Sequence, residues 1–312
     1  MSGTRQVKPA AGLFAAVAIA GFMVMQASGQ APGGAGPSPR SIAGGTFEAS
    51  GVVHVPGTAG VLFVDDGRTR EIFWMEVGAN GAQPSPAVAI PLAADITDLE
   101  GITSDGSSFY VVGSQSKKNG YQGDGLVRFK FNPQTRRTEA VERIQGLKAW
   151  MAAHVPELKG AAQKSGDEVL NIEGLAWDPR GERLLLGLRA PVVNGHALII
   201  PVKLQDPRGA FSAANLRLDG PAIHLPLGGA GVRSLEYDGM TSTFRIITGA
   251  GLNNENRDFR ILEWKGDASP GSLPVIATYN RDLKPEGITR GTFNGRQVSL
   301  VVFDTGRFVL LD

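Results

Sequence analysis

The chain has 312 residues, of which 42 are glycine and 19 are proline, and it contains no cysteine. The lack of cysteine excludes disulfides, thiolate metal sites, a cysteine nucleophile and a lipid-modified N-terminal cysteine. The 31 Lys and Arg residues nearly balance the 30 Asp and Glu residues, so a basic surface for nucleic acid is not expected. The high content of glycine and proline is typical of many short strands joined by tight turns, and not of a helical bundle.

The first element in chain order has the layout of a secretory signal peptide. Arg5 and Lys8 precede an apolar run over residues 10–25, and small residues follow up to Gly29. We expect cleavage after Gly29. An uncleaved anchor is the alternative, although the run is shorter than the about 20 apolar residues that cross a bilayer comfortably. Residues 30–40 continue as a flexible Gly/Pro linker, so a periplasmic or secreted protein with no membrane span after cleavage of residues 1–29 is predicted.

A short pattern recurs along the remaining chain and indicates an internal repeat. It consists of an apolar residue, a glutamate and then a small or aromatic residue. Clear copies occupy residues 99–102, 172–175, 235–238 and 285–288, and a looser copy occupies residues 47–50. Between the copies, apolar runs of strand length alternate with turn residues. Strands are predicted over residues 61–64, 72–77, 109–112, 126–131, 184–186, 197–202, 244–247, 259–264, 300–303 and 308–311.

The repeat predicts an all-β fold, namely a β-propeller over residues 41–312. Each interval between the glutamates can hold a four-stranded blade, which needs about 40–50 residues. We predict five blades, with six as the alternative. The longer intervals imply insertions, and residues 147–163 have the apolar spacing of a short helix interrupted at Pro156. The last repeat supplies only three strands, so residues 41–46 are expected to add the fourth strand and close the ring.

Two sets of residues are expected at one mouth of the propeller channel, because the inner strands begin where the second strands end. The first set is a ring of glutamates, one from each blade, and the second set follows the second strands. Carboxylate oxygens suit a hard cation, and calcium fits an oxygen-lined site outside the cytoplasm best. The candidate ligands of this metal are Glu48, Glu100, Glu173, Glu236, Glu286, Asp66 and Asp304.

The predicted ring of carboxylates needs a compensating charge, because like charges within a few ångströms raise each other's pKa. A bound cation would supply that charge. Basic partners such as Arg189, Arg233 and Lys284, or partial protonation, are the alternatives. A further alternative needs no ligand at all, since each glutamate can accept hydrogen bonds from backbone N–H groups of the neighbouring blade and so hold the ring together.

Other polar residues at the predicted mouth have the chemistry of a ligand site. The guanidinium of Arg189 suits a carboxylate or a phosphate. Ser114, Ser116 and Lys117 offer hydroxyl and ammonium groups to an anion. The basic partners named above complete this set of ligand-binding candidates.

The sequence contains few signs of a catalytic centre. A nucleophile elbow, a zinc-protease helix, a phosphate-binding loop and a dinucleotide-binding glycine pattern are all missing from it. If the protein is an enzyme, its general base is therefore expected among the glutamates, with Glu173 and Glu286 as the candidates.

Several stretches of the sequence resemble a known family. They are DLEGIT with YVVGSQS, the long stretch NIEGLAWDPRGERLLLGLRAPVVNGHALIIPV, then GVRSLEYD and KPEGIT. Together they are similar to a bacterial family catalogued only as domain of unknown function 3616, over roughly residues 45–312. The pattern of that family has histidine where this chain has Gln115. More distantly, the blades resemble esterase-like phytases and gluconolactonase-type propellers, in which a channel metal binds substrate oxygens, and this likeness implies a fold alone.

Two functions fit these observations. The first is an exported propeller whose acidic, cation-binding central site binds a small molecule or a protein partner without turnover. The second is a metal-dependent hydrolase of phosphoesters, esters or lactones, in which the cation polarises a substrate oxygen and a ring carboxylate activates water. The missing nucleophile and base motifs favour the binding protein.

Overall fold

The computed structural model describes residues 1–3, 38–78, 80–117, 123–249 and 257–312. The predicted signal peptide, apart from residues 1–3, and most of the predicted linker lie outside the described residues. Residues Gly36–Asp312 form one compact unit, and its strands are grouped into antiparallel sheets that follow one another along the chain. This arrangement is a β-propeller of five blades, so the prediction of five blades is confirmed and the alternative of six is wrong.

The strands of the first two blades are ordered from the inside outward as they occur in the sequence. Blade 1 consists of β2 (Ala49–His54), β3 (Gly60–Asp65), β4 (Glu71–Glu76) and β5 (Val88–Pro91). Blade 2 consists of β6 (Leu99–Ser104), β7 (Phe109–Gly113), β8 (Leu126–Asn132) and β9 (Arg137–Ile144). Such a meander needs only tight hairpin connections, which the many Gly, Asp and Asn residues of the sequence provide.

Blades 3 and 4 follow the same order. Blade 3 consists of β10 (Asn171–Asp178), β11 (Arg183–Ala190) and β12 (Ala197–Leu204), and both β13 (Leu216–Leu218) and β14 (Ile223–Leu225) pair with β12 at its outer edge. Blade 4 consists of β15 (Gly231–Asp238), β16 (Thr243–Gly249), β17 (Phe259–Trp264) and β18 (Val275–Tyr279).

Blade 5 joins the two ends of the propeller sequence. It consists of β19 (Pro285–Phe293), β20 (Arg296–Phe303), β21 (Arg307–Leu311) and, at the outer edge, β1 (Arg40–Ser41). Arg40 pairs with Phe308 and Ser41 pairs with Arg307. The predicted closure is therefore confirmed, but the closing strand ends at Ser41 and does not continue to residue 46. A turn follows, in which Gly44 has a φ of 117° that breaks the extended conformation.

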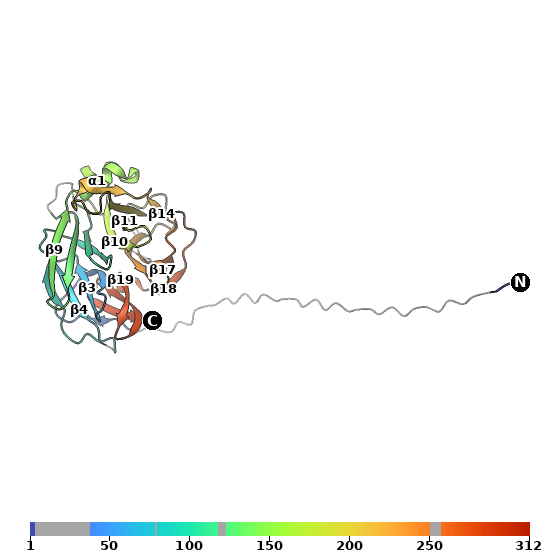
Figure 1. Cartoon of the computed structure of the whole chain (residues 1–312), viewed down its shortest axis with the longest axis horizontal. Coiled ribbons are helices and arrows are strands. Elements are labelled where there is room, and N and C mark those ends of the chain that lie inside the picture. Colours follow the sequence, from blue (N-terminus) through green and yellow to red (C-terminus); the bar gives the residue numbers. More distant parts are fainter. Residues whose placement is uncertain (4–37, 79, 118–122, 250–256) are drawn as a thin grey trace. The chain divides into compact units, whose positions relative to one another are not determined.

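The inner strands β2, β6, β10, β15 and β19 lie side by side around a common axis, and each is next to the inner strands of two neighbouring blades. Figure 1 shows the blades following one another around the ring in the order of the colours, so that the red blade 5 meets the blue blade 1. The start of every inner strand therefore lies at the same end of the axis, which we call the axial mouth.

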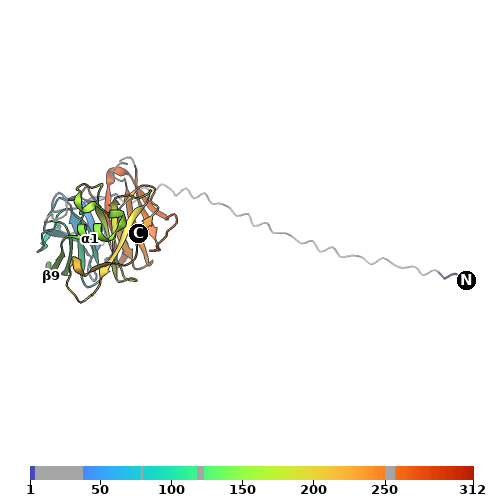
Figure 2. The same cartoon turned by 90° about the horizontal axis from the view of Figure 1, so that it is seen from above.

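Short helices lie in several of the connections between the strands. They are α1 (Leu147–His154), η1 (Pro156–Leu158), η2 (Ala161–Gln163), η3 (Ala213–Asn215) and η4 (Arg281–Leu283). The first three fall within the stretch for which the sequence predicts a helical insertion. In Figures 1 and 2, α1 lies on the outside of the ring beside blades 2 and 3.

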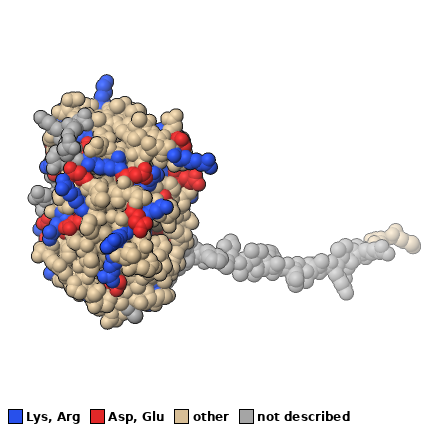
Figure 3. Space-filling view, turned by 60° about the vertical axis from the view of Figure 1, so that its left-hand side comes forward, with Lys and Arg blue, Asp and Glu red and all other residues tan. Residues whose placement is uncertain are grey.

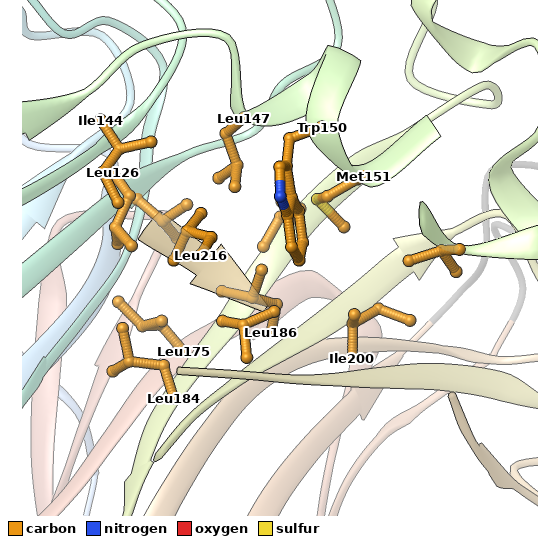
Figure 4. Packing of buried hydrophobic residues seen from close by; sticks show 14 of the residues in the cluster. Leu126, Ile144, Leu147, Trp150, Met151, Leu175, Leu184, Leu186, Ile200 and Leu216 are labelled. Carbon is orange, nitrogen blue, oxygen red and sulfur yellow. The ribbon is translucent and has the colours of Figure 1, made fainter. Parts of the chain in front are cut away.

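The hydrophobic core is divided among the interfaces between adjacent blades. Separate clusters of buried residues fill the interfaces of blades 1 and 2, 2 and 3, 3 and 4, 4 and 5, and 5 and 1. At the interface of blades 2 and 3, Trp150 and Met151 of α1 pack with Leu186 and Ile200 of blade 3 (Figure 4). Removal of this apolar surface from water, worth about 25 cal/mol per Å², holds the insertion against the propeller.

Two features concern contacts with other molecules, namely the distribution of surface charge and the length of the helices. On the face shown in Figure 3, basic and acidic side chains are interspersed and do not form a patch of a single sign. Among the described residues, no helix is long and apolar enough to cross a membrane.

Candidate functional site at the axial mouth

Every inner strand carries a β-bulge at an equivalent position near the axial mouth. The pairing of each inner strand with the second strand skips one residue, and that residue is left without a partner in the ladder. A bulge turns the side chain of the skipped residue in a new direction, and such bulges recur next to functional sites. The skipped residues, which we call the axial ring, are Ser50, Glu100, Glu173, Arg233 and Glu286.

The axial ring contains three of the five predicted glutamates. The prediction that all five would meet at the mouth is wrong for Glu236, whereas Glu48 lies at the mouth but outside the axial ring. Glu48 lies two residues before the bulge of blade 1, outside β2, and is exposed at the mouth. Glu236 lies three residues beyond the bulge of blade 4 and is buried farther along the inner strand.

Glu236 joins two blades instead of facing the mouth. Its Oε1 accepts a hydrogen bond from the hydroxyl of Thr289, 3.1 Å away, and its carboxyl also accepts one from the backbone N–H of Arg290. Threonines join other pairs of blades in a similar way. The hydroxyl of Thr103 in blade 2 accepts from the N–H of Trp177 in blade 3, and the hydroxyl of Thr289 in blade 5 accepts from the N–H of His54 in blade 1. The alternative in which glutamates join adjacent blades without a ligand therefore describes Glu236.

A signal in the sequence marks the correct register in blade 4. In blades 2, 3 and 4 an aspartate at the end of the inner strand, or directly after it, caps the following hairpin by accepting a backbone N–H. These aspartates are Asp105, Asp178 and Asp238, each five residues after the bulge. Counting back five residues from Asp238 gives Arg233 and not Glu236, so the hairpin aspartate aligns the repeats better than the glutamate does.

Arg233 supplies the positive charge at the centre of the axial ring. Its Nη1 donates to Oε1 and Oε2 of Glu173 at 3.0 and 2.8 Å, and its Nη2 lies 3.1 Å from Oε1 of Glu286. Only 8% of Arg233 is exposed, and its guanidinium lies 5.6 Å from the centre of the Phe259 ring. Burial lowers the pKa of Arg233, but the negative charges of Glu173 and Glu286 outweigh it and raise the pKa overall. The buried arginine therefore stays charged.

A second arginine reaches the same carboxylate. Nη1 of Arg189, at the end of β11, lies 2.8 Å from Oε1 of Glu173. Asn171 donates its amide to that oxygen as well, at 3.3 Å. Two guanidinium groups and an amide therefore hold the carboxyl group of Glu173 in place.

The other two glutamates of the axial ring favour the protonated state. Burial is the main cause of the raised pKa of Glu100, and the charges of Glu173 and Glu286 add to it. Burial also raises the pKa of Glu286 to about 8, although Arg233 acts in the opposite direction. Two of the predicted ways to compensate the negative charge of the ring are therefore present. Arg233 neutralises Glu173, and protonation neutralises Glu100 and Glu286.

Further carboxyl groups surround the axial ring at the mouth. Burial, together with the charges of Glu48, Asp304, Asp65 and Asp98, raises the pKa of Asp66 to about 7. Most of these groups follow or precede strands of blades 5, 1 and 2. Carboxyl groups therefore outnumber basic groups at the described part of the mouth.

The predicted anion-binding residues contact the carboxyl groups instead. Asp98 accepts a hydrogen bond from the hydroxyl of Ser114, and the hydroxyl of Ser116 lies 3.4 Å from the same carboxylate oxygen. Nζ of Lys284 lies 2.6 Å from Asp304, and this hydrogen bond raises the pKa of the ammonium group. Lys117 is exposed. The two serines thus act as donors that stabilise an acidic group.

Several buried polar atoms at the mouth have no hydrogen-bond partner among the described residues. They include Nε of Arg189, Nε of Arg233, Oδ1 of Asn171 and Oδ1 of Asp66. Buried polar atoms are hydrogen-bonded as a rule, and each one left unsatisfied costs about 1–3 kcal/mol. At the axial mouth these atoms are two donors and two acceptors, so a polar molecule that paired with them would need to offer groups of both kinds.

A buried lysine that the sequence did not single out positions one side of the mouth. Lys148 of α1 is 0% exposed, and its Nζ donates to the backbone oxygens of Lys117, Lys164 and Ser116 at 2.6, 2.9 and 3.3 Å. These bonds hold the loop after β7, which carries Ser114, against the insertion. A lone lysine in an amphipathic helix gives no sign of such a role, because the acceptors come from loops far away in the sequence.

The described residues of the mouth do not form a ligand set for the predicted calcium ion. Within the part of the chain that the structure describes, no three Asp, Glu or His side chains form a group that could hold a metal ion. The positive charge of Arg233 stands at the centre of the predicted ring. Calcium binding stays a prediction.

The fold and the site define a class: the chain is a five-bladed β-propeller with a cluster of buried ionisable groups at one end of its axis. Residues 153–306 match the family described as "Protein of unknown function (DUF3616)". The resemblance seen in the sequence motifs is thereby confirmed over this stretch. No curated protein matches the sequence of the chain.

Solved structures with a similar arrangement of strands share little sequence with the chain. A glucose dehydrogenase has 12% identity and a TM-score of 0.47, with 88% of this chain and 99% of that chain covered. The glutaminyl cyclase of Myxococcus xanthus has 15% identity and a TM-score of 0.47, with 88% and 93% covered. The soluble aldose sugar dehydrogenase of Escherichia coli has 12% identity and a TM-score of 0.47, with 88% and 98% covered.

Proposed function

We propose that the axial mouth binds a small polar molecule and that the propeller is a binding protein. One observation carries this proposal: buried ionisable groups and unsatisfied buried polar atoms lie together at one end of the axis. A few convergent polar groups in a protected site are the usual means by which proteins orient a small ligand.

The chemistry of the mouth suits a ligand with several hydrogen-bonding groups. The protonated carboxyls of Glu100 and Glu286 can donate as well as accept. The N–H groups of Arg189 and Arg233 donate. A molecule with hydroxyl, ammonium or carboxylate groups can therefore pair with groups of both kinds.

A hydrolase is the second candidate, and the raised pKa of Glu286 favours it. A carboxyl with a pKa of about 8 holds a proton at neutral pH and can protonate a leaving group. Glu173 is less suited to this role, because two arginines hold its carboxylate. A bound calcium ion, as proposed from the sequence, would polarise the substrate oxygen of a phosphoester, ester or lactone.

A ligand screen that also detects products separates these candidates. Polar metabolites would be added to protein purified without chelator, and the melting temperature would be measured with calcium or with EDTA. A ligand at a hundred times its Kd adds about 2.7 kcal/mol to the free energy of unfolding, which a melting curve resolves. Product formation would be followed by NMR in the same mixtures.

The binding proposal predicts a saturable rise in melting temperature without any product. Asp98→Asn should abolish the rise, whereas the control Asp206→Asn, in an exposed loop, should retain it. A product that disappears in Glu286→Gln would instead support the hydrolase. If both variants respond like the unchanged protein, the mouth is not the ligand site.

The localisation of the protein is proposed from the sequence alone. The signal-peptide pattern over residues 1–29 supports export to the periplasm or the medium. Fractionation of cells that produce the full chain, with detection of the propeller in each fraction, tests this proposal.

A further inference from the structure

We propose that the ligand of the axial mouth is a zwitterion, with an ammonium group at one end and a carboxylate at the other. This inference rests on the proposed function, because it specifies the charges of the ligand bound at the same site. The distribution of charge around the axis carries it. Apart from Glu173, which the arginines hold, the acidic groups come from three neighbouring blades, and Arg189 and Arg233 come from the other two.

The acidic half of the mouth is formed by blades 5, 1 and 2. It consists of Asp304 from blade 5, Glu48, Asp65 and Asp66 from blade 1, and Asp98 from blade 2. The backbone N–H of Glu48 donates to Asp65 at 3.0 Å, and the N–H of Asp66 donates to the backbone oxygen of Glu48 at 3.3 Å. The negative charges of the other four residues raise the pKa of Asp66.

An ammonium group fits the acidic half. Oδ1 of Asp66 is buried and has no partner in the described part of the chain. An ammonium group presents three N–H donors on one positive charge, and it can therefore reach several carboxylate oxygens at once. A neutral hydroxyl would bring a donor but would leave the excess negative charge uncompensated.

The basic half of the mouth is formed by Arg189 of blade 3 and Arg233 of blade 4. Arg189 uses Nη1 to hold Glu173, and its Nε is buried with no partner among the residues that the structure describes. The side chain as a whole is 22% exposed, although its Nε is buried. Nε of Arg233 is likewise buried without a described partner, on a side chain that is only 10% exposed.

A carboxylate fits the basic half. The Nε and Nη2 side of a guanidinium is a pair of parallel donors that matches the two oxygens of a carboxylate. Glu173 occupies the opposite side of Arg189, through Nη1. An anion without an ammonium group would place its charge beside the acidic half, and a cation alone would leave the arginine N–H groups unsatisfied.

The test uses amino acids whose two charges lie at different separations. Glycine, β-alanine, 4-aminobutanoate and 6-aminohexanoate would be titrated into the full-length protein by calorimetry at neutral pH. The amide and the N-acetyl derivative of the tightest binder would follow, because each removes one charge and leaves the rest of the molecule nearly unchanged. We expect the zwitterion to bind at least tenfold more tightly than either derivative.

Two variants assign the charges to the two halves. Arg189→Gln should abolish the preference for the zwitterion over its amide, and Arg189→Lys should restore part of that preference. Asp98→Asn should abolish the preference for the zwitterion over its N-acetyl derivative. Arg208→Gln, at an exposed position in a loop, serves as the control that changes neither preference. Melting curves of each variant show whether it is folded.

The possible outcomes separate this inference from the proposed function. If the amide binds as tightly as the zwitterion, the mouth is a cation site, so the inference is overturned while the proposed function stands. If no member of the series binds, but an uncharged metabolite raises the melting temperature in a way that depends on Asp98, the inference is again overturned while the proposed function stands. If neither the series nor the metabolite screen gives a shift, both fail.

Discussion

Replacement of Glu236 by glutamine should change how the stability of the propeller depends on pH. Burial raises the pKa of this carboxyl from an ordinary value of 4.5 to about 8, and it accepts hydrogen bonds from Thr289 and Arg290. The unfolded chain releases the proton near pH 4.5, whereas the folded protein keeps it until about pH 8. Between these values the folded state binds more protons, so stability falls as the pH rises.

The size of the effect follows from the two pKa values. One pKa unit corresponds to about 1.4 kcal/mol, so the contribution of Glu236 between pH 4.5 and pH 8 is of the order of 3–5 kcal/mol. Glutamine has nearly the same shape, can still accept from Thr289, and does not titrate. The free energy of unfolding of Glu236→Gln should therefore decrease less with pH than that of the unchanged protein.

Urea unfolding followed by tryptophan fluorescence at half-unit pH steps from 5 to 8 measures this difference directly. Glu139→Gln, at an exposed position of β9, is the matched control and should leave the pH dependence unchanged. The other buried glutamates titrate in both proteins, so the difference between the two curves isolates Glu236. Parallel curves would refute the reasoning and would mean that Glu236 is ionised in the folded protein.

Three further substitutions test the contacts around the mouth. Arg233→Met leaves Glu173 buried without its main partner and should lower the free energy of unfolding by about 3–5 kcal/mol, as measured in urea; an unchanged midpoint would contradict a buried ion pair. Lys148→Met leaves backbone oxygens unsatisfied and should cost about 1–3 kcal/mol, with faster hydrogen exchange in residues 114–117; unchanged exchange there would show that the lysine does not hold the loop. Trp150→Ala should lower stability by about 3–5 kcal/mol in the same urea assay, and a much smaller loss would show that the insertion packs loosely.

The blades could be predicted from the sequence because their signals are local. Each strand is a short apolar run bounded by turn residues, and the same order recurs in every repeat. The closing strand could also be expected, since a last repeat of three strands leaves an edge that only the other end of the propeller sequence can cover. Its length could not, because the turn that follows at residues 43–45, in which Gly44 has a φ of 117°, depends on backbone conformation.

The axial ring was only partly predictable because its register depends on bulges. One extra residue in an inner strand changes which side chain faces the axis, and no apolar pattern records that change. Glu100, Glu173 and Glu286 were aligned correctly because a small residue follows each of them. In blades 1 and 4 the ring residues are Ser50 and Arg233, so a search for glutamates selected neighbours that lie elsewhere.

The bulges also separate the side chains of the channel from the hydrogen bonds of the sheets. A residue that takes no part in the ladder can be exchanged for one of different size or charge without loss of a strand-to-strand bond. The five equivalent positions already hold serine, glutamate and arginine, each skipped in the same way by the pairing of the strands. A propeller built in this way can acquire a new specificity by point substitution at a few positions, which makes those positions the natural targets for redesign.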